Sequence, residues 1–206
     1  MLDVAAQARD GRAFGELAPA GYYIALRIGF AFPLAEQNLL PKGWIDQYTK
    51  QNFMLVDPVI NWLYRHAGAI RWSAITLPDP QNVLTQAAQH GLKFGVAICF
   101  DDPSPKGQRS FGSFCRSDRE FSDEEISILA TKLEWLHRAT APPTNLTRSE
   151  LEALRMVKDG FLVKEIASIL GVTDGAVKQR LKNAKMKLGA KTGSQAVSSA
   201  TGYGLI

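Results

Sequence analysis

The chain has 206 residues, of which 46% are hydrophobic and 21% are charged. This composition excludes a disordered protein and suits either one large domain or an ordinary domain with a small second one. No apolar run approaches the roughly 18 to 20 residues of a membrane-spanning helix, and residues 1–16 carry charges where a signal peptide would be apolar. We therefore expect a cytoplasmic protein without a membrane partner.

Cysteine and histidine spacing gives no sign of a disulfide framework or a metal site. Cys99 and Cys115 form no CxxC pattern, and the three histidines are scattered singly. We expect both thiols to be small core residues. The sequence also lacks a G-x-S-x-G elbow and a complete P-loop. We therefore predict no catalytic residue, no metal and no cofactor.

Charge and aromatic residues divide unevenly at the Pro-containing stretch 139–145 (ATAPPTN), which we interpret as a linker. Up to Asn145 there are 14 basic and 15 acidic residues, and after it there are 10 and 5. Of the 19 aromatic residues, 17 precede this point. We expect a nearly neutral domain at 1–138, suited to an apolar pocket, and a basic domain at 146–206, suited to a polyanion.

The first domain mixes strand and helix patterns. Residues 22–32, 95–100 and 109–115 are predicted strands. Residues 123–138 are the clearest helix, because Ser122 and Glu125 have capping-box spacing ahead of an apolar stripe. The predicted fold is α+β, a helix-covered antiparallel sheet in an α-β-α sandwich, followed by a small all-α domain.

One group of residues in this domain combines an acid with donor-bearing aromatics among apolar neighbours. Its members are Trp44, Tyr48, Asp57, Pro58, Val59 and Trp72. Trp44 and Tyr48 share a helix face, and a buried Asp57 would need hydrogen bonds that a ligand amide N–H could supply. The alternative is that the aromatics are ordinary core residues and that Asp57 only caps a helix before Pro58.

The second domain begins with a helix that Thr147 and Glu150 cap at capping-box spacing. Its expected buried residues are Leu151, Leu154, Met156 and Val157. Gly160 fits a helix stop, residues 163–170 form a short second helix, and Gly171 permits a sharp turn. Thr173 then caps a third helix at 174–188.

The spacing of Ala167, Gly171 and Val177 indicates a helix-turn-helix, since two steeply crossing helices need a small contact residue, a turn glycine and an apolar anchor. Six basic and no acidic residues lie between positions 178 and 191. Those expected to face outward are Lys178, Arg180, Lys182, Lys185 and Lys187. They would bind DNA phosphates. The alternative is a solvated basic face on a small helical bundle.

A longer set of residues in the C-terminal segment forms a recognisable pattern: Leu146, Thr147, Glu150, Glu152, Leu154, Gly160, Glu165, Ile166, Ala167, Leu170, Val177, Asn183, Lys187, Leu188, Ala196, Val197, Ala200, Gly204, Leu205 and Ile206. Through these residues the segment resembles the DNA-binding domain of LuxR-type transcription regulators. The resemblance implies a third helix that reads double-stranded DNA and a fourth, near 194–200, that pairs two protomers as a homodimer. The expected DNA-binding residues are Thr173, Lys178, Gln179, Arg180, Lys182, Asn183 and Lys185. Ala176, Arg180 and Gly193 depart from the residues usual in that family.

The first domain is similar to the autoinducer-binding domain of the same family through Trp44, Tyr48, Asp57-Pro58-Val59, Trp72 and Gly95. The resemblance implies an N-acyl homoserine lactone as effector. Trp44 would donate to the lactone carbonyl, Tyr48 would contact the acyl-amide oxygen and Asp57 would accept the amide N–H, while Trp72 would pack beside the lactone. Leu40 replaces a tyrosine common in the family.

Apolar side chains would select the acyl chain, and the candidates are Leu26, Ile28, Phe53, Leu55 and Ile98. The predicted function is a ligand-responsive, quorum-sensing transcription regulator that binds DNA as a homodimer. One alternative has the same architecture but is independent of acyl-lactones, using another ligand or a protein partner. A second is an enzyme whose basic tail binds an acidic partner.

Overall fold

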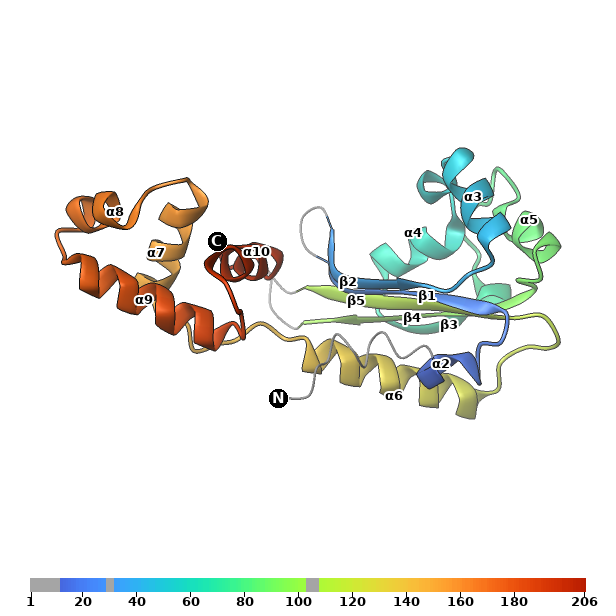
Figure 1. Ribbon diagram of the computed structural model, residues 1–206. Coiled ribbons are helices and arrows are strands. Elements are labelled where there is room, and N and C mark those ends of the chain that lie inside the picture. Colours follow the sequence, from blue (N-terminus) through green and yellow to red (C-terminus); the bar gives the residue numbers. More distant parts are fainter. Residues whose placement is uncertain (1–11, 29–31, 103–107) are drawn as a thin grey trace. The chain divides into compact units, whose positions relative to one another are not determined.

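The computed structural model describes residues 12–28, 32–102 and 108–206 (Figure 1). The chain divides into two compact units: residues 12–28 with 35–140 belong to the first, the N-terminal unit, and residues 32–34 with 141–206 belong to the second, the C-terminal unit. The elements up to residue 140 are α2 (Arg12–Gly15), β1 (Gly21–Ile28), β2 (Pro33–Asn38), α3 (Lys42–Lys50), the 3-10 helix η1 (Phe53–Leu55), α4 (Pro58–Arg65), β3 (Gly68–Arg71), the 3-10 helix η2 (Trp72–Ala74), α5 (Val83–Gln89), β4 (Phe94–Asp101), β5 (Arg109–Arg116) and α6 (Asp123–Ala139).

The five strands form one sheet in the order β2-β1-β5-β4-β3. The β1–β5, β5–β4 and β4–β3 pairs are antiparallel. Figure 1 shows α3, α4 and α5 over one face of the sheet and α2 with α6 over the other. The predicted α+β fold with a helix-covered antiparallel sheet is confirmed.

Alternation along the strands sends side chains into two separate cores. On β4, Val96 and Ile98 pack toward α6, whereas Ala97 and Cys99 face α3, α4 and α5. Small residues on the second face leave room for the aromatic side chains of the helices. Both cysteines, Cys99 and Cys115, are buried and unbonded in this second core, as expected.

Two of the predicted strands were close in extent, but the prediction of one strand over residues 22–32 was wrong. β1 ends at Ile28 and β2 starts at Pro33, and residues 29–31 lie outside the described part of the chain. The sequence prediction also missed β2 and β3. Both are edge strands with mixed or exposed side chains, so they lack the alternation that marks a strand.

A buried polar cluster fixes the end of α6 to the sheet. A bulge in β1 places Arg27 in the left-handed region at φ 53°, and its guanidinium Nε donates to the His137 carbonyl oxygen at 2.9 Å. Arg27 also pairs with Asp102, while the His137 ring contacts Ser110 Oγ at 2.8 Å. Burial, together with the Arg27 charge, lowers the pKa of His137, so its imidazole is neutral at pH 7.

The C-terminal unit contains α7 (Arg148–Lys158), α8 (Val163–Leu170), α9 (Asp174–Lys187) and α10 (Gly193–Gly202). Thr147 and Glu150 form the predicted capping box, and Thr173 caps α9 by accepting from the Ala176 N–H at 3.2 Å. Gly171 adopts φ 64° at the end of α8. Ala167 and Val177 pack in one cluster across this turn, as a helix-turn-helix requires.

The buried face of α7 differs in part from the prediction. Leu154 is buried as expected, but Leu151, Met156 and Val157 are only partly buried. Ala153 instead fills the space beside Leu154, with Glu150 the third buried residue of the helix. A small residue at this position allows α7 to lie close to its neighbours.

Lys187 was predicted to face outward for DNA, and this prediction was wrong. Its Nζ lies 2.9 and 2.8 Å from the two carboxylate oxygens of Glu150 and 2.8 Å from the Asn145 carbonyl oxygen. Burial alone would raise the pKa of Glu150, but hydrogen bonds from Lys187 and Thr147 outweigh it and hold the pKa below its usual value. Lys187 is therefore a structural residue.

We predict that Lys187→Met lowers the free energy of unfolding of the C-terminal unit by about 2–3 kcal/mol, because it leaves the Glu150 carboxylate buried without its cation. Denaturant unfolding of the full chain measures this. Lys182→Met is the matched control, since Lys182 is exposed on the same helix and loses the same charge. Equal stability of the two variants would contradict the structural role of Lys187.

Candidate functional site

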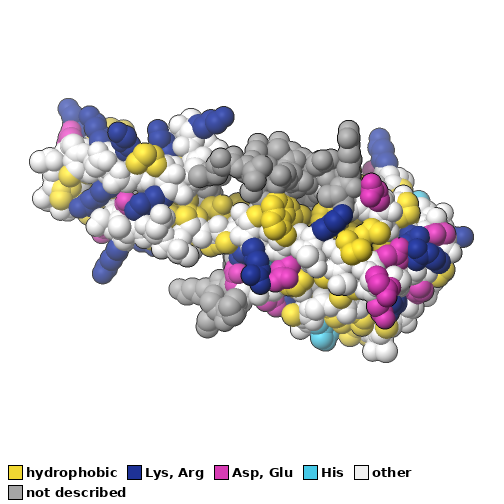
Figure 2. Space-filling view, turned by 90° about the horizontal axis from the view of Figure 1, so that it is seen from below, with side chains coloured by type: hydrophobic (Ala, Val, Ile, Leu, Met, Phe, Trp, Pro, Cys, Tyr) yellow, Lys and Arg dark blue, Asp and Glu magenta, His cyan; other side chains and the backbone are white. Residues whose placement is uncertain are grey.

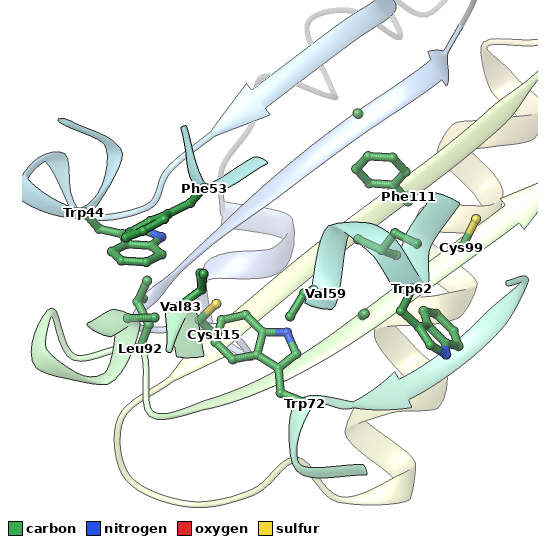
Figure 3. Close-up of a cluster of buried hydrophobic side chains, with 14 residues drawn as sticks. Trp44, Phe53, Val59, Trp62, Trp72, Val83, Leu92, Cys99, Phe111 and Cys115 are labelled. Atoms are coloured by element: carbon green, nitrogen blue, oxygen red, sulfur yellow. The ribbon is translucent and has the colours of Figure 1, made fainter. Parts of the chain in front are cut away.

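Trp44, Val59 and Trp72 belong to the buried core on the face of the sheet covered by α3, α4 and α5 (Figure 3), and Tyr48 packs against this core. Trp44 and Tyr48 lie one turn apart on α3, with ring centroids 5.5 Å apart in an edge-to-face arrangement. Phe53 of η1 contacts both rings, at 5.8 Å from each. We call Trp44, Tyr48, Asp57 and Trp72 the head-group cluster.

Asp57 is the polar centre of the head-group cluster and is only 7% exposed. Its Oδ1 accepts from the Val59 N–H at 2.7 Å, which makes it the N-cap of α4, and Pro58 occupies the first turn. Its Oδ2 accepts from the Tyr48 hydroxyl at 2.8 Å. The helix-cap interpretation is therefore correct for one oxygen, and the other oxygen joins α4 to α3.

Burial dominates the electrostatics at this point. It raises the pKa of Asp57, although the hydrogen bonds from Tyr48 and Val59 act in the opposite direction. Burial likewise raises the pKa of Tyr48, with the Asp57 charge adding to the effect. Tyr48 thus stays protonated, and its hydroxyl donates a hydrogen bond to Asp57. A ligand carbonyl could accept a hydrogen bond from the Tyr48 hydroxyl only in competition with the Asp57 carboxylate.

Trp72 joins the cluster from η2, and Gly95 of β4 makes room for it. A Cβ on Gly95 would lie 2.2 Å from both Cδ2 and Cε2 of the indole, so only glycine fits beneath the ring. Gly95 lies near the start of β4 and pairs with Cys115 of β5, so the indole packs over this end of the sheet. A glycine inside a predicted strand was the sequence signal for this close approach.

The residues proposed to line an acyl chain do not lie together. Phe53 and Ile28 belong to the core that holds the head-group cluster. Leu26 and Ile98 pack on the opposite face of the sheet against α6, and Leu55 is 80% exposed, so these three assignments were wrong. Alternation along a strand shows which residues of that strand share a face of the sheet. It does not show whether that face is the one covered by α6 or the one covered by α3, α4 and α5.

Other side chains of this core were missed by sequence reasoning. His90 packs against Trp44 with ring centroids 5.6 Å apart, and its Nε2 lies 2.8 Å from Gln47 Oε1. Trp62 and Phe111 are further aromatic members of the core. A lone histidine and single aromatics carry no pattern that marks a site. Among the described residues, no group of His, Cys, Asp or Glu is arranged to hold a metal ion.

The second candidate site is α9 in the C-terminal unit. Lys178, Gln179 and Lys182 are exposed, and Arg180, Asn183 and Lys185 are partly exposed. Gln179 Nε2 donates to Asn183 Oδ1 at 2.8 Å, so these two amides share one stripe of the helix. Figure 2 shows Lys and Arg side chains projecting from this unit with few acidic ones among them.

Thr173 has a position different from the other predicted DNA-binding residues. Its hydroxyl accepts from the Ala176 N–H and so is committed to the start of α9, although the residue itself is exposed.

Across 12–28, 32–102 and 108–206, no helix is long and apolar enough to cross a membrane.

Comparison with known proteins identifies both units. The autoinducer binding domain family matches residues 37–141, and the bacterial regulatory proteins of the luxR family match residues 144–200. The regulatory protein SdiA of Escherichia coli is 30% identical over 183 residues, covering 81% of this chain and 74% of SdiA. The quorum-sensing regulator RhlR of Pseudomonas aeruginosa is 27% identical over 197 residues, covering 90% of this chain and 82% of RhlR.

A solved structure of SdiA in complex with octanoyl-rac-glycerol has the same fold. It aligns with a TM-score of 0.50 and 26% identity, covering 98% of this chain and 87% of SdiA. The two family matches and these relatives exclude the alternative of an enzyme with a basic tail. The chain belongs to the LuxR family of transcription regulators, with an autoinducer-binding domain that takes a small-molecule effector and a helix-turn-helix domain that binds DNA.

Proposed function

We propose that the head-group cluster binds the polar end of an N-acyl homoserine lactone, and that this binding governs how a homodimer engages DNA. The single observation that carries the proposal is the Asp57 carboxylate, which is buried beside an apolar core and is held there by hydrogen bonds from the Tyr48 hydroxyl and the N-terminal backbone of α4. A carboxylate oxygen can accept a further hydrogen bond, and an amide N–H would supply it.

The roles we assign follow the family resemblance and fit the arrangement. Asp57 accepts the amide N–H, while Pro58 and Val59 hold its carboxylate at the start of α4. Tyr48 orients that carboxylate and contacts the acyl-amide oxygen. Trp44 donates to the lactone carbonyl, and Gly95 admits the ring of Trp72.

A second candidate effector is an amphiphile without a lactone. Two observations favour it: Leu40 stands where the family commonly has tyrosine, and the SdiA structure holds octanoyl-rac-glycerol. Such a ligand offers hydroxyl groups, which can donate to Asp57 and also accept, in place of an amide N–H. The affinity of the full chain for the two ligand classes distinguishes them.

The regulatory mechanism we propose is a shift of populations. A ligand that binds only the folded, DNA-competent state stabilises it by RT ln(1 + [L]/Kd), about 2.7 kcal/mol at a hundredfold excess over Kd. We place the working boundaries at 1–138 for the ligand domain, 139–145 for the linker and 146–206 for the DNA-binding domain. α10 is the surface we assign to pairing of the two protomers.

We predict that Asp57→Asn weakens binding of N-octanoyl homoserine lactone by about 1–3 kcal/mol, because it removes a charged acceptor while asparagine still caps α4. Isothermal titration with the full chain measures this. Asp46→Asn is the matched control, since Asp46 is exposed on the helix that carries Tyr48. If both variants bind the lactone like the wild type, Asp57 is not the amide acceptor.

For DNA, Lys178→Ala and Lys182→Ala should each weaken binding to random duplexes and to duplexes selected by the wild type alike. Each removes a phosphate-neutralising cation, so the slope of log affinity against log salt should become shallower by about 1. Lys50→Ala, an exposed charge on α3, is the control and should leave the slope unchanged. An unaltered slope in the two α9 variants would remove these lysines from the interface.

A further inference from the structure

One polar atom in the head-group cluster has no partner. The indole Nε1 of Trp72 is fully buried and makes no hydrogen bond within the described part of the chain. The residue as a whole is 9% exposed. Buried N–H groups are almost always paired, and each exception calls for an explanation. If Trp72 served only to fill space, its N–H would carry a cost and bring no benefit.

The indole of Trp72 packs directly on the backbone of the sheet. Its bridging carbons lie over the Gly95 backbone, at the place where a Cβ would come within 2.2 Å of them. Figure 3 shows the Trp72 nitrogen turned toward Val59, on the inside of the buried cluster. The Val59 N–H donates to the Asp57 carboxylate that caps α4. The unpaired Trp72 donor therefore lies on the same side of the sheet as this carboxylate.

We propose that Trp72 donates a hydrogen bond from Nε1 to an oxygen of the bound effector's head group other than the acyl carbonyl oxygen. This deepens the proposed function and rests on it. An indole N–H is a donor only, whereas the Asp57 carboxylate is an acceptor only, so the two residues require different groups of the ligand. The effector must therefore combine a hydrogen-bond donor for Asp57 with a separate acceptor oxygen for Trp72, and Trp72 helps to determine specificity.

The test compares two ligands and two side chains in the full chain. The ligands are N-octanoyl homoserine lactone and N-octanoyl cyclopentylamide, which keeps the amide and the five-membered ring but has no ring oxygens. The side chain is changed by Trp72→Phe and by replacement of Trp72 with 3-benzothienylalanine, which keeps the bicyclic shape but lacks the N–H. The same benzothienyl replacement at Trp135, 48% exposed on α6, is the control.

We expect the benzothienyl replacement at Trp72 to weaken lactone binding about 3- to 10-fold, as for one hydrogen bond, and to change cyclopentylamide binding less than twofold. Trp72→Phe should show the same selectivity between ligands on top of any general loss of packing. Equal losses for both ligands, or no loss for either, would overturn the proposal, because the Trp72 N–H would then not donate to an oxygen that only the lactone carries.

Two further measurements separate this proposal from the identity of the effector. In the unliganded protein, the benzothienyl variant should unfold at a denaturant concentration no lower than the wild type, and a lower midpoint would mean that the N–H already has a partner. Octanoyl glycerol carries oxygens but no amide. If it binds the wild type and loses affinity in the Trp72 variant while the lactone does not bind, the lactone proposal fails and the role of Trp72 stands.

Discussion

The ligand domain is organised around a carboxylate that is held in an apolar core. Asp57 caps α4 with one oxygen and takes the Tyr48 hydroxyl with the other, so it joins two helices while remaining largely desolvated. A charge in that position is costly unless its hydrogen bonds are nearly complete. Around it lie the edge-to-face pair of Trp44 and Tyr48 and, on the same side of the sheet, Trp72 packed on the backbone of Gly95.

The sheet connects this cluster with the helix that leads to the DNA-binding domain. The central strands β4 and β5 contribute side chains to both cores, one toward the head-group cluster and one toward α6. On the α6 side, Arg27 donates a hydrogen bond to the carbonyl oxygen of His137, two residues before α6 ends at Ala139. The end of α6 is therefore fixed to the sheet by a buried arginine that is itself paired with Asp102.

Much of this was predictable where local chemistry determines structure. The capping boxes at Ser122 and Thr147 and the Ala167, Gly171, Val177 spacing predicted their helices and the turn because these signals act within a few residues. The assignments that failed depend on contacts far along the chain. Nothing near Lys187 in the sequence shows that Glu150 lies beside it, since the two residues are brought together only by the packing of α7 on α9.

The candidate site shows the same division. The sequence grouped Trp44, Tyr48 and Asp57 correctly. It could not show that the Tyr48 hydroxyl donates a hydrogen bond to Asp57, nor which face of the sheet Ile98 occupies. Val96 and Ile98 are bulky and Ala97 and Cys99 are small, and alternation alone does not say which pair faces the helices of the site. Only the positions of α4 and α6 decide that.

Native mass spectrometry of the full chain, produced in the presence of a mixture of N-acyl homoserine lactones, tests the central claim most directly, because one spectrum reports ligand mass and subunit number. The account predicts a species of two subunits, each retaining one lactone. Recovery of folded protein that carries no small molecule from the mixture, in any state of assembly, would contradict it.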